Sequence, residues 1–126
     1  MDFEGLQQLM RDNGIVGCGG AGFPSYAKLN KNVDTLIINC AECEPLLRLH
    51  RQLIEVRAEE IVQTAEFIAN IIGAKRVIIG IKAAYQKAIH ALNNQLGKYT
   101  LTSLHLLNKN QMANEQLKSI HKHFIF

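Results

Sequence analysis

DTLII, residues 34–38, is a short, continuous apolar run with β-branched side chains. Runs of this kind are typical of strands that are buried on both faces, as in a parallel sheet. The polar segment NCAECEP, residues 39–45, follows directly and is therefore expected at the carboxyl end of the strand. Open α/β sheets bind their ligands at this end of their strands. The stretch from 34 to 45 thus predicts a buried strand and, next to it, a place for a ligand.

A long helix is predicted after this segment. Apolar side chains recur at mostly helical spacing over residues 46–72, and Gly73 is a suitable residue to end the helix. A helix of this length is unusual in a small domain, so we expect a break near Arg57. Arg48 and Arg51 lie one turn apart near the helix start. We expect these two arginines to form structural salt bridges rather than a phosphate clamp.

The chain then alternates between strands and helices up to residue 107. RVIIGI, residues 76–81, predicts a second buried strand, residues 85–96 predict an amphipathic helix that ends at Gly97, and residues 100–107 predict a third strand. The order β-α-β-α-β favours a parallel sheet with right-handed crossovers. We therefore predict the α/β class: a small three-layer domain with a short parallel sheet, preceded by a glycine-rich loop.

That loop is GCGGAGFP, residues 17–24. Because glycine has no Cβ, such a loop brings its backbone N–H groups close to a phosphate or a flat ring; the alternative is a glycine-rich surface turn. Three of the glycines match the G-x-G-x-x-G dinucleotide fingerprint. That fingerprint requires a strand before the loop, whereas residues 4–14 predict a short helix, and the closing proline prevents a helix from starting inside the loop. We therefore reject the dinucleotide interpretation of this loop.

Glu42 and Glu44 are two carboxylates separated by one residue, in a polar cluster with Asn39. One hypothesis places them at a ligand site beyond the first strand. The other makes them ordinary acids that favour the N-terminus of the following helix. The sequence supports both hypotheses.

GCGGAGFPSYAK, residues 17–28, followed by NCAECEP, residues 39–45, resembles a known family. It is similar to the flavin-binding domain shared by the NADH-oxidising flavoprotein subunit of respiratory complex I, the RnfC-type protein of the Rnf electron-transport complex, and the cobalamin-reductase and proline-reductase-associated electron-transfer proteins. The resemblance covers about residues 12–107, the N-terminal part of that domain. Cys18 and Ala41 stand where the complex I protein has an arginine and an aspartate, so the chain is more similar to the Rnf-like branch.

The resemblance implies FMN as cofactor and NADH as a possible electron donor. It implies that the glycine loop packs its backbone amides against FMN, that a lysine contacts the cofactor, and that an asparagine hydrogen-bonds the flavin. It also implies that two carboxylates border the place where NADH lies. The positions concerned are Gly17, Gly19, Gly20, Gly22, Lys28, Asn39, Glu42 and Glu44. No catalytic residue of the protein itself is implied.

The function implied is part of a flavin-dependent electron-transfer protein, which takes electrons from NADH or a similar donor through FMN and passes them to iron–sulfur centres. The implied partners are other electron-transfer subunits or domains, including membrane-associated complexes. Residues 1–107 then form the N-terminal part of the FMN domain, and the polar, basic residues 108–126 form an atypical tail. The alternative is a truncated, catalytically silent α/β module that keeps the fold without binding flavin. We expect the chain alone to be inactive and to bind FMN weakly or not at all.

The composition of the chain limits the kinds of protein that it can be. With 126 residues, 48% of them hydrophobic and 20% charged, the chain is expected to form one globular domain. The net charge of +3 is dispersed, so no nucleic-acid partner is predicted. No apolar run of about 18 residues and no signal-peptide pattern is present, so we expect a cytoplasmic protein. An apolar surface around Leu104, Leu106 and Leu107 is expected to favour self-association.

A metal site is not expected. Cys40 and Cys43 form a C-x-x-C pair, but only Cys18 remains to join them, and zinc or an iron–sulfur cluster usually requires four soft ligands. The five histidines are dispersed along the chain. The sequence therefore predicts no metal ligand set.

Overall fold

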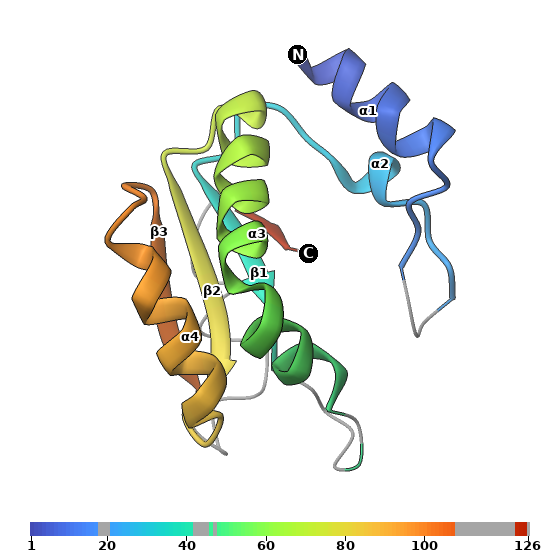
Figure 1. Cartoon of the computed structure of the whole chain (residues 1–126). Coiled ribbons are helices and arrows are strands. Elements are labelled where there is room, and N and C mark those ends of the chain that lie inside the picture. The colour runs from blue at the N-terminus through green and yellow to red at the C-terminus, as the bar shows by residue number, and fades with distance from the viewer. Residues whose placement is uncertain (18–20, 42–45, 47, 108–122, 126) are drawn as a thin grey trace.

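A computed structural model describes residues 1–17, 21–41, 46, 48–107 and 123–125 (Figure 1). The elements follow in the order α1 (Phe3–Asp12), α2 (Ser25–Lys28), β1 (Thr35–Asn39), α3 (Leu49–Ile72), β2 (Arg76–Lys82), α4 (Gln86–Leu96), β3 (Thr102–Leu107) and β4 (His123–Ile125).

The strands form one parallel sheet with the order β3-β2-β1-β4. The predicted α/β class and the β-α-β-α-β order are confirmed. Thr35 of β1 lies opposite Arg76 of β2, and Asn39 lies opposite Gly80. The strand order runs from β1 through β2 to β3 on one side, whereas β4 lies on the other side of β1. The reversal creates a topological switch point at the carboxyl end of β1, the place where such sheets bind ligands.

Both crossover helices cover the same face of the sheet. In Figure 1, α3 and α4 lie side by side in front of β1, β2 and β3. Val77, Ile79 and Ile81 of β2 point toward them and are fully buried. Successive side chains of a strand alternate between faces, so Thr35 and Ile37 of β1 point away from α3. They are fully buried as well, so β1 is buried on both of its faces.

Helix α3 has the predicted break and the predicted end. It starts at Leu49, three residues later than expected, and its backbone leaves helical geometry at Arg57 (φ −132°, ψ 30°). The side chain of Arg57 donates to both carboxylate oxygens of Glu60, at 3.1 and 2.7 Å, and this hydrogen bonding raises the pKa of Arg57. Gly73 ends the helix in the left-handed conformation (φ 79°) that glycine adopts without strain.

Strand β4 was not predicted. His123–Ile125 belong to the segment that the sequence marked as a polar, basic tail, and they pair in parallel with Thr35–Ile37 of β1. Strand β3 lies at an edge of the described sheet. Its Leu106 is exposed and its Leu104 is half-buried, whereas the side chain of Leu107 lies outside the described residues.

The carboxylate of Glu66 in α3 accepts hydrogen bonds from the start of β3. Its Oε1 accepts hydrogen bonds from the backbone N–H of Leu101 (2.8 Å) and of Thr102 (3.0 Å), and from the Thr102 hydroxyl (2.9 Å). The carboxylate is partly buried, so its loss leaves these donors without an acceptor in a site that water reaches poorly.

We expect Glu66→Ala to lower the free energy of unfolding by about 2–3 kcal/mol, because several hydrogen bonds to a charged group are lost together. Urea denaturation measures the change. Glu59→Ala is the matched control, because within the described residues Glu59 forms an exposed salt bridge with Lys98 at 3.2 Å and no other side-chain hydrogen bond or ion pair. Such a pair contributes at most about 1 kcal/mol. Equal losses in the two variants would contradict the role of Glu66.

Candidate functional site

The glycine-rich loop is closed at its base by backbone contacts. Val16 and Pro24 form an isolated antiparallel bridge, and the N–H of Gly17 donates to the carbonyl of Phe23 at 2.9 Å. Gly22 has a positive φ of 68°, which glycine adopts readily and other residues do not. The described end of the loop therefore depends on glycine at position 22 for its conformation.

Lys28 lies beside the loop. It is the last residue of α2, it is exposed, and its Nζ lies 5.6 Å from the centre of the Phe23 ring. This cation–π contact holds the ammonium group near the closing residues of the loop. The structure thus brings together Gly17, Gly22 and Lys28, three of the positions that the sequence predicted for cofactor contact.

Asn39 occupies the carboxyl end of β1, at the switch point of the sheet. Its Oδ1 accepts a hydrogen bond from the N–H of Ala41 at 3.1 Å, which fixes the turn after the strand. Asn39 is exposed, and among the described residues its side-chain NH₂ has no acceptor. This amide can therefore donate to a ligand at the end of the strand.

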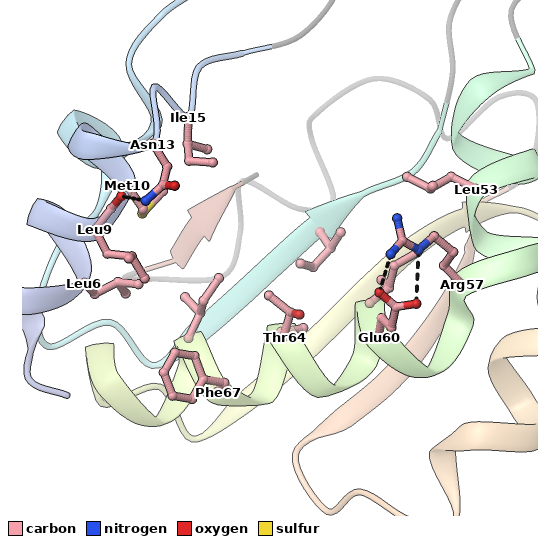
Figure 2. A pocket seen from close by; sticks show the side chains of 14 residues that line it. Leu6, Leu9, Met10, Asn13, Ile15, Leu53, Arg57, Glu60, Thr64 and Phe67 are labelled. Atoms are coloured by element: carbon pink, nitrogen blue, oxygen red, sulfur yellow. Dashed lines mark hydrogen bonds and ion pairs between the residues drawn. The ribbon is translucent and has the colours of Figure 1, made fainter.

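An apolar groove of about 760 Å³ lies between α1 and α3, and Ile38 of β1 contributes to its lining. Figure 2 shows Leu9 of α1 on one side and Leu53 and Phe67 of α3 on the other. Its volume is in the range of small-molecule sites. Two of its lining residues lie close in sequence to predicted positions: Ile15 comes just before the glycine loop, and Ile38 directly precedes Asn39.

Sequence reasoning missed this groove. The signal available in the sequence was weak: Leu9, Leu53 and Phe67 are large apolar residues, and each remains more than 40% exposed in the structure. Scattered exposed apolar residues are common, so only their gathering in space marks a site.

The structure does not bring all the predicted cofactor-binding residues together. Lys28, Asn39 and the described glycines do not line the groove, and no hydrogen bond among the described residues links the glycine loop to Asn39. The other predicted positions lie outside the described residues: Gly19, Gly20, Glu42 and Glu44. The cofactor roles of all eight positions stay predictions.

Metal ligands do not gather in the described part of the chain. Within these ranges, no group of three or more His, Cys, Asp or Glu side chains is placed to hold a metal ion. Cys40 is buried just after β1, and the other two cysteines lie outside the described ranges. None of the helices in these ranges is long and apolar enough to cross a membrane.

A parallel sheet with a polar side chain at its switch point is the arrangement in which open α/β domains bind their ligands. Comparison with known families specifies the domain further. Residues 10–121 match the family of the Nuo51 FMN-binding domain, and the chain belongs to this family. The match continues past residue 107, where the resemblance in the sequence ended.

Similar proteins agree with this assignment. The chain is 43% identical over 91 residues to the cobalamin reductase PduS of Citrobacter freundii, covering 72% of this chain and 20% of that protein. It is 35% identical over 101 residues to the C component of the Na⁺-translocating ferredoxin:NAD⁺ oxidoreductase complex of Acetobacterium woodii, covering 77% of this chain and 23% of that protein. The chain thus spans less than a quarter of the length of these relatives.

A similar solved structure is an air-oxidised NAD⁺-reducing [NiFe]-hydrogenase. One of its chains superposes with a TM-score of 0.65 and 26% identity, over 85% of this chain and 20% of that chain. The solved structure thus supports the α/β fold, and the family match makes the chain a member of a flavin-binding family.

Proposed function

We propose that the chain forms the FMN-holding part of a flavin-dependent electron-transfer protein. The proposal is supported by three observations: Lys28 lies beside the glycine loop, Asn39 lies at the sheet's switch point, and the chain is a member of an FMN-binding family. FMN supplies the redox chemistry when bound, and the protein supplies position and electrostatics.

The described residues suit the three chemical parts of FMN. The ammonium group of Lys28 is a donor of the kind that phosphates bind, and we propose the same role for backbone amides of the loop. The NH₂ of Asn39 is a donor for the polar edge of the flavin ring. The groove beside Ile15 and Ile38 offers apolar surface to a flat ring. These three features support a cofactor that combines charge, polar edges and a large apolar face.

The proposal also covers the electron donor, the electron acceptor and the partner proteins. The similar hydrogenase is NAD⁺-reducing, and one relative belongs to a ferredoxin:NAD⁺ oxidoreductase complex. We propose NADH or a similar dinucleotide as the donor and iron–sulfur centres of other subunits or domains as the acceptor. Glu42 and Glu44 are proposed to border the donor. The protein would then act at the cytoplasmic side of such a complex.

Lys28→Gln tests the cofactor proposal. We expect FMN affinity, measured by quenching of flavin fluorescence, to fall at least about fivefold, because a charged donor to the cofactor is lost. Lys31→Gln is the matched control: Lys31 also lies over an aromatic ring, that of Phe3 at 4.8 Å, and pairs with Glu4, whose pKa it lowers. Equal effects of the two substitutions would overturn the assignment of Lys28. A chain that binds no FMN would favour the silent α/β module instead.

A further inference from the structure

Three elements bring two cations to one aromatic ring. The guanidinium carbon of Arg51, in the first turn of α3, lies 4.9 Å from the centre of the Tyr85 ring. The Nζ of Lys82, at the end of β2, lies 5.7 Å from the same centre. Tyr85 is the N-cap residue of α4, and all three side chains are half-buried. We call these three residues the basic corner.

The salt-bridge role expected for Arg51 is not observed within the described residues. Lys31, Arg57 and Lys98 each lie within 3.2 Å of a carboxylate there, but no described carboxylate pairs with Arg51. Its guanidinium lies against the Tyr85 ring instead. The ring restrains the arginine and reduces the side-chain entropy that binding would otherwise cost.

The basic corner lies at the N-terminus of α4, which is the positive end of the helix dipole. Helix α4 begins at Gln86, no side chain caps it, its first turn contains no acidic residue, and Lys87 lies in that turn. Cations near a helix N-terminus are unfavourable, whereas anions there are stabilised by the helix dipole. Arg51, Lys82 and Lys87 thus bring three cations to a helix end whose dipole also favours an anion.

The corner lies at the ligand-binding edge of the sheet. Gly80 of β2 is the register partner of Asn39, and Lys82 is two residues further along β2. The basic corner and Asn39 thus lie at the carboxyl ends of neighbouring strands, whereas Lys28 and the glycine loop lie on α2 and before it.

We propose that the basic corner binds the pyrophosphate of the dinucleotide donor, while Lys28 and the glycine loop bind the flavin cofactor. This inference rests on the proposed function for the identity of the donor. The planar guanidinium of Arg51 suits bidentate contact with phosphate oxygens, and Lys82 and the α4 amides add charge and donors. The flavin's own phosphate has the same chemistry, and the experiment separates the two sources.

The test measures binding of inorganic pyrophosphate, NADH and FMN to the 126-residue chain at low salt, by amide chemical shifts. We expect pyrophosphate to shift the amides of Arg51, Lys82 and Lys87, and Arg51→Gln to weaken pyrophosphate and NADH at least about fivefold without changing FMN affinity. Arg51→Lys should weaken them less, because it keeps the charge. Arg11→Gln is the matched control, since Arg11 lies over the Tyr26 ring in the same way at 4.7 Å. It should leave all three affinities nearly unchanged.

Two results would overturn the inference. One is that pyrophosphate and NADH do not bind, or bind equally to the Arg51→Gln chain. The other is that Arg51→Gln weakens FMN and pyrophosphate but not NADH, which would assign the corner to the flavin phosphate. If the unsubstituted chain does not bind FMN while its pyrophosphate binding still depends on Arg51, the proposed function is contradicted. The anion site at the basic corner would then still stand.

Discussion

Replacing Gly22 with valine is expected to lower FMN affinity at least tenfold, or about 1.4 kcal/mol. Gly22 has a φ of 68°, and a β-branched residue at positive φ is strongly disfavoured. A Cβ built there meets no atom within 4 Å, so the strain arises in the backbone and not from a clash. The loop is expected to relax to another conformation and to lose the amide directions that a flavin requires. Fluorescence titration with FMN measures the change.

Gly73→Val controls for the strain itself. Gly73 has a similar φ of 79°, its Cβ position is also open, and it lies at the end of α3, away from the loop. Both substitutions are expected to lower the free energy of unfolding by about 1–2 kcal/mol or more. Only Gly22→Val should weaken FMN. If Gly73→Val weakens FMN by the same factor, the loop has no special role in binding.

Ile79→Ala is expected to have the largest effect on stability, a loss of about 3–4 kcal/mol in the free energy of unfolding. Ile79 lies in the middle of β2, is fully buried, and belongs to the core cluster that includes Ile54 and Leu92. Its removal leaves a cavity between the sheet and both crossover helices. Because whole domains are stable by only about 5–15 kcal/mol, this loss is a large fraction of the total.

Val56→Ala provides the comparison for Ile79. Val56 is also a branched residue but is 78% exposed on α3, so its truncation should change stability by no more than about 0.5 kcal/mol. Urea denaturation of the two variants gives both values. A small loss for Ile79→Ala, close to that of Val56→Ala, would mean that β2 is not the centre of the core.

The elements predicted correctly have strong local signals. The run at residues 34–38 is apolar and β-branched with little interruption, and most of it forms β1. The break at Arg57 and the end at Gly73 follow from helix length and from glycine's access to positive φ. Such features depend on a few neighbouring residues, so the sequence alone is sufficient to predict them.

Strand β4 has no comparable signal. It consists of three residues, too few for any periodicity, and its pairing with β1 joins segments that are far apart in the sequence (Thr35 with His123). Pairing over such separations is decided by tertiary structure. The same reason explains why the groove between α1 and α3 was missed, since its two walls come from distant helices.

The candidate site was predictable only within each short motif. Gly17, Gly22 and Lys28 come together because a turn and a single short helix connect them. Arg51 was expected in a salt bridge, but its contact with Tyr85 requires α3 and α4 to pack together, which spacing along the chain does not reveal. Local pattern therefore identified the candidate binding motifs but not the surfaces between them.

The most direct test of the central claim, that these residues form part of an FMN site, is titration of FMN into the purified 126-residue chain. We expect saturable one-to-one binding with a Kd weaker than about 1 μM, that is, less favourable than about −8 kcal/mol. Tighter binding, with a Kd of about 1 μM or lower, would contradict the expectation that the chain holds only part of the site. No saturable change up to millimolar FMN would contradict the proposal that this chain holds FMN, and it would favour the silent α/β module.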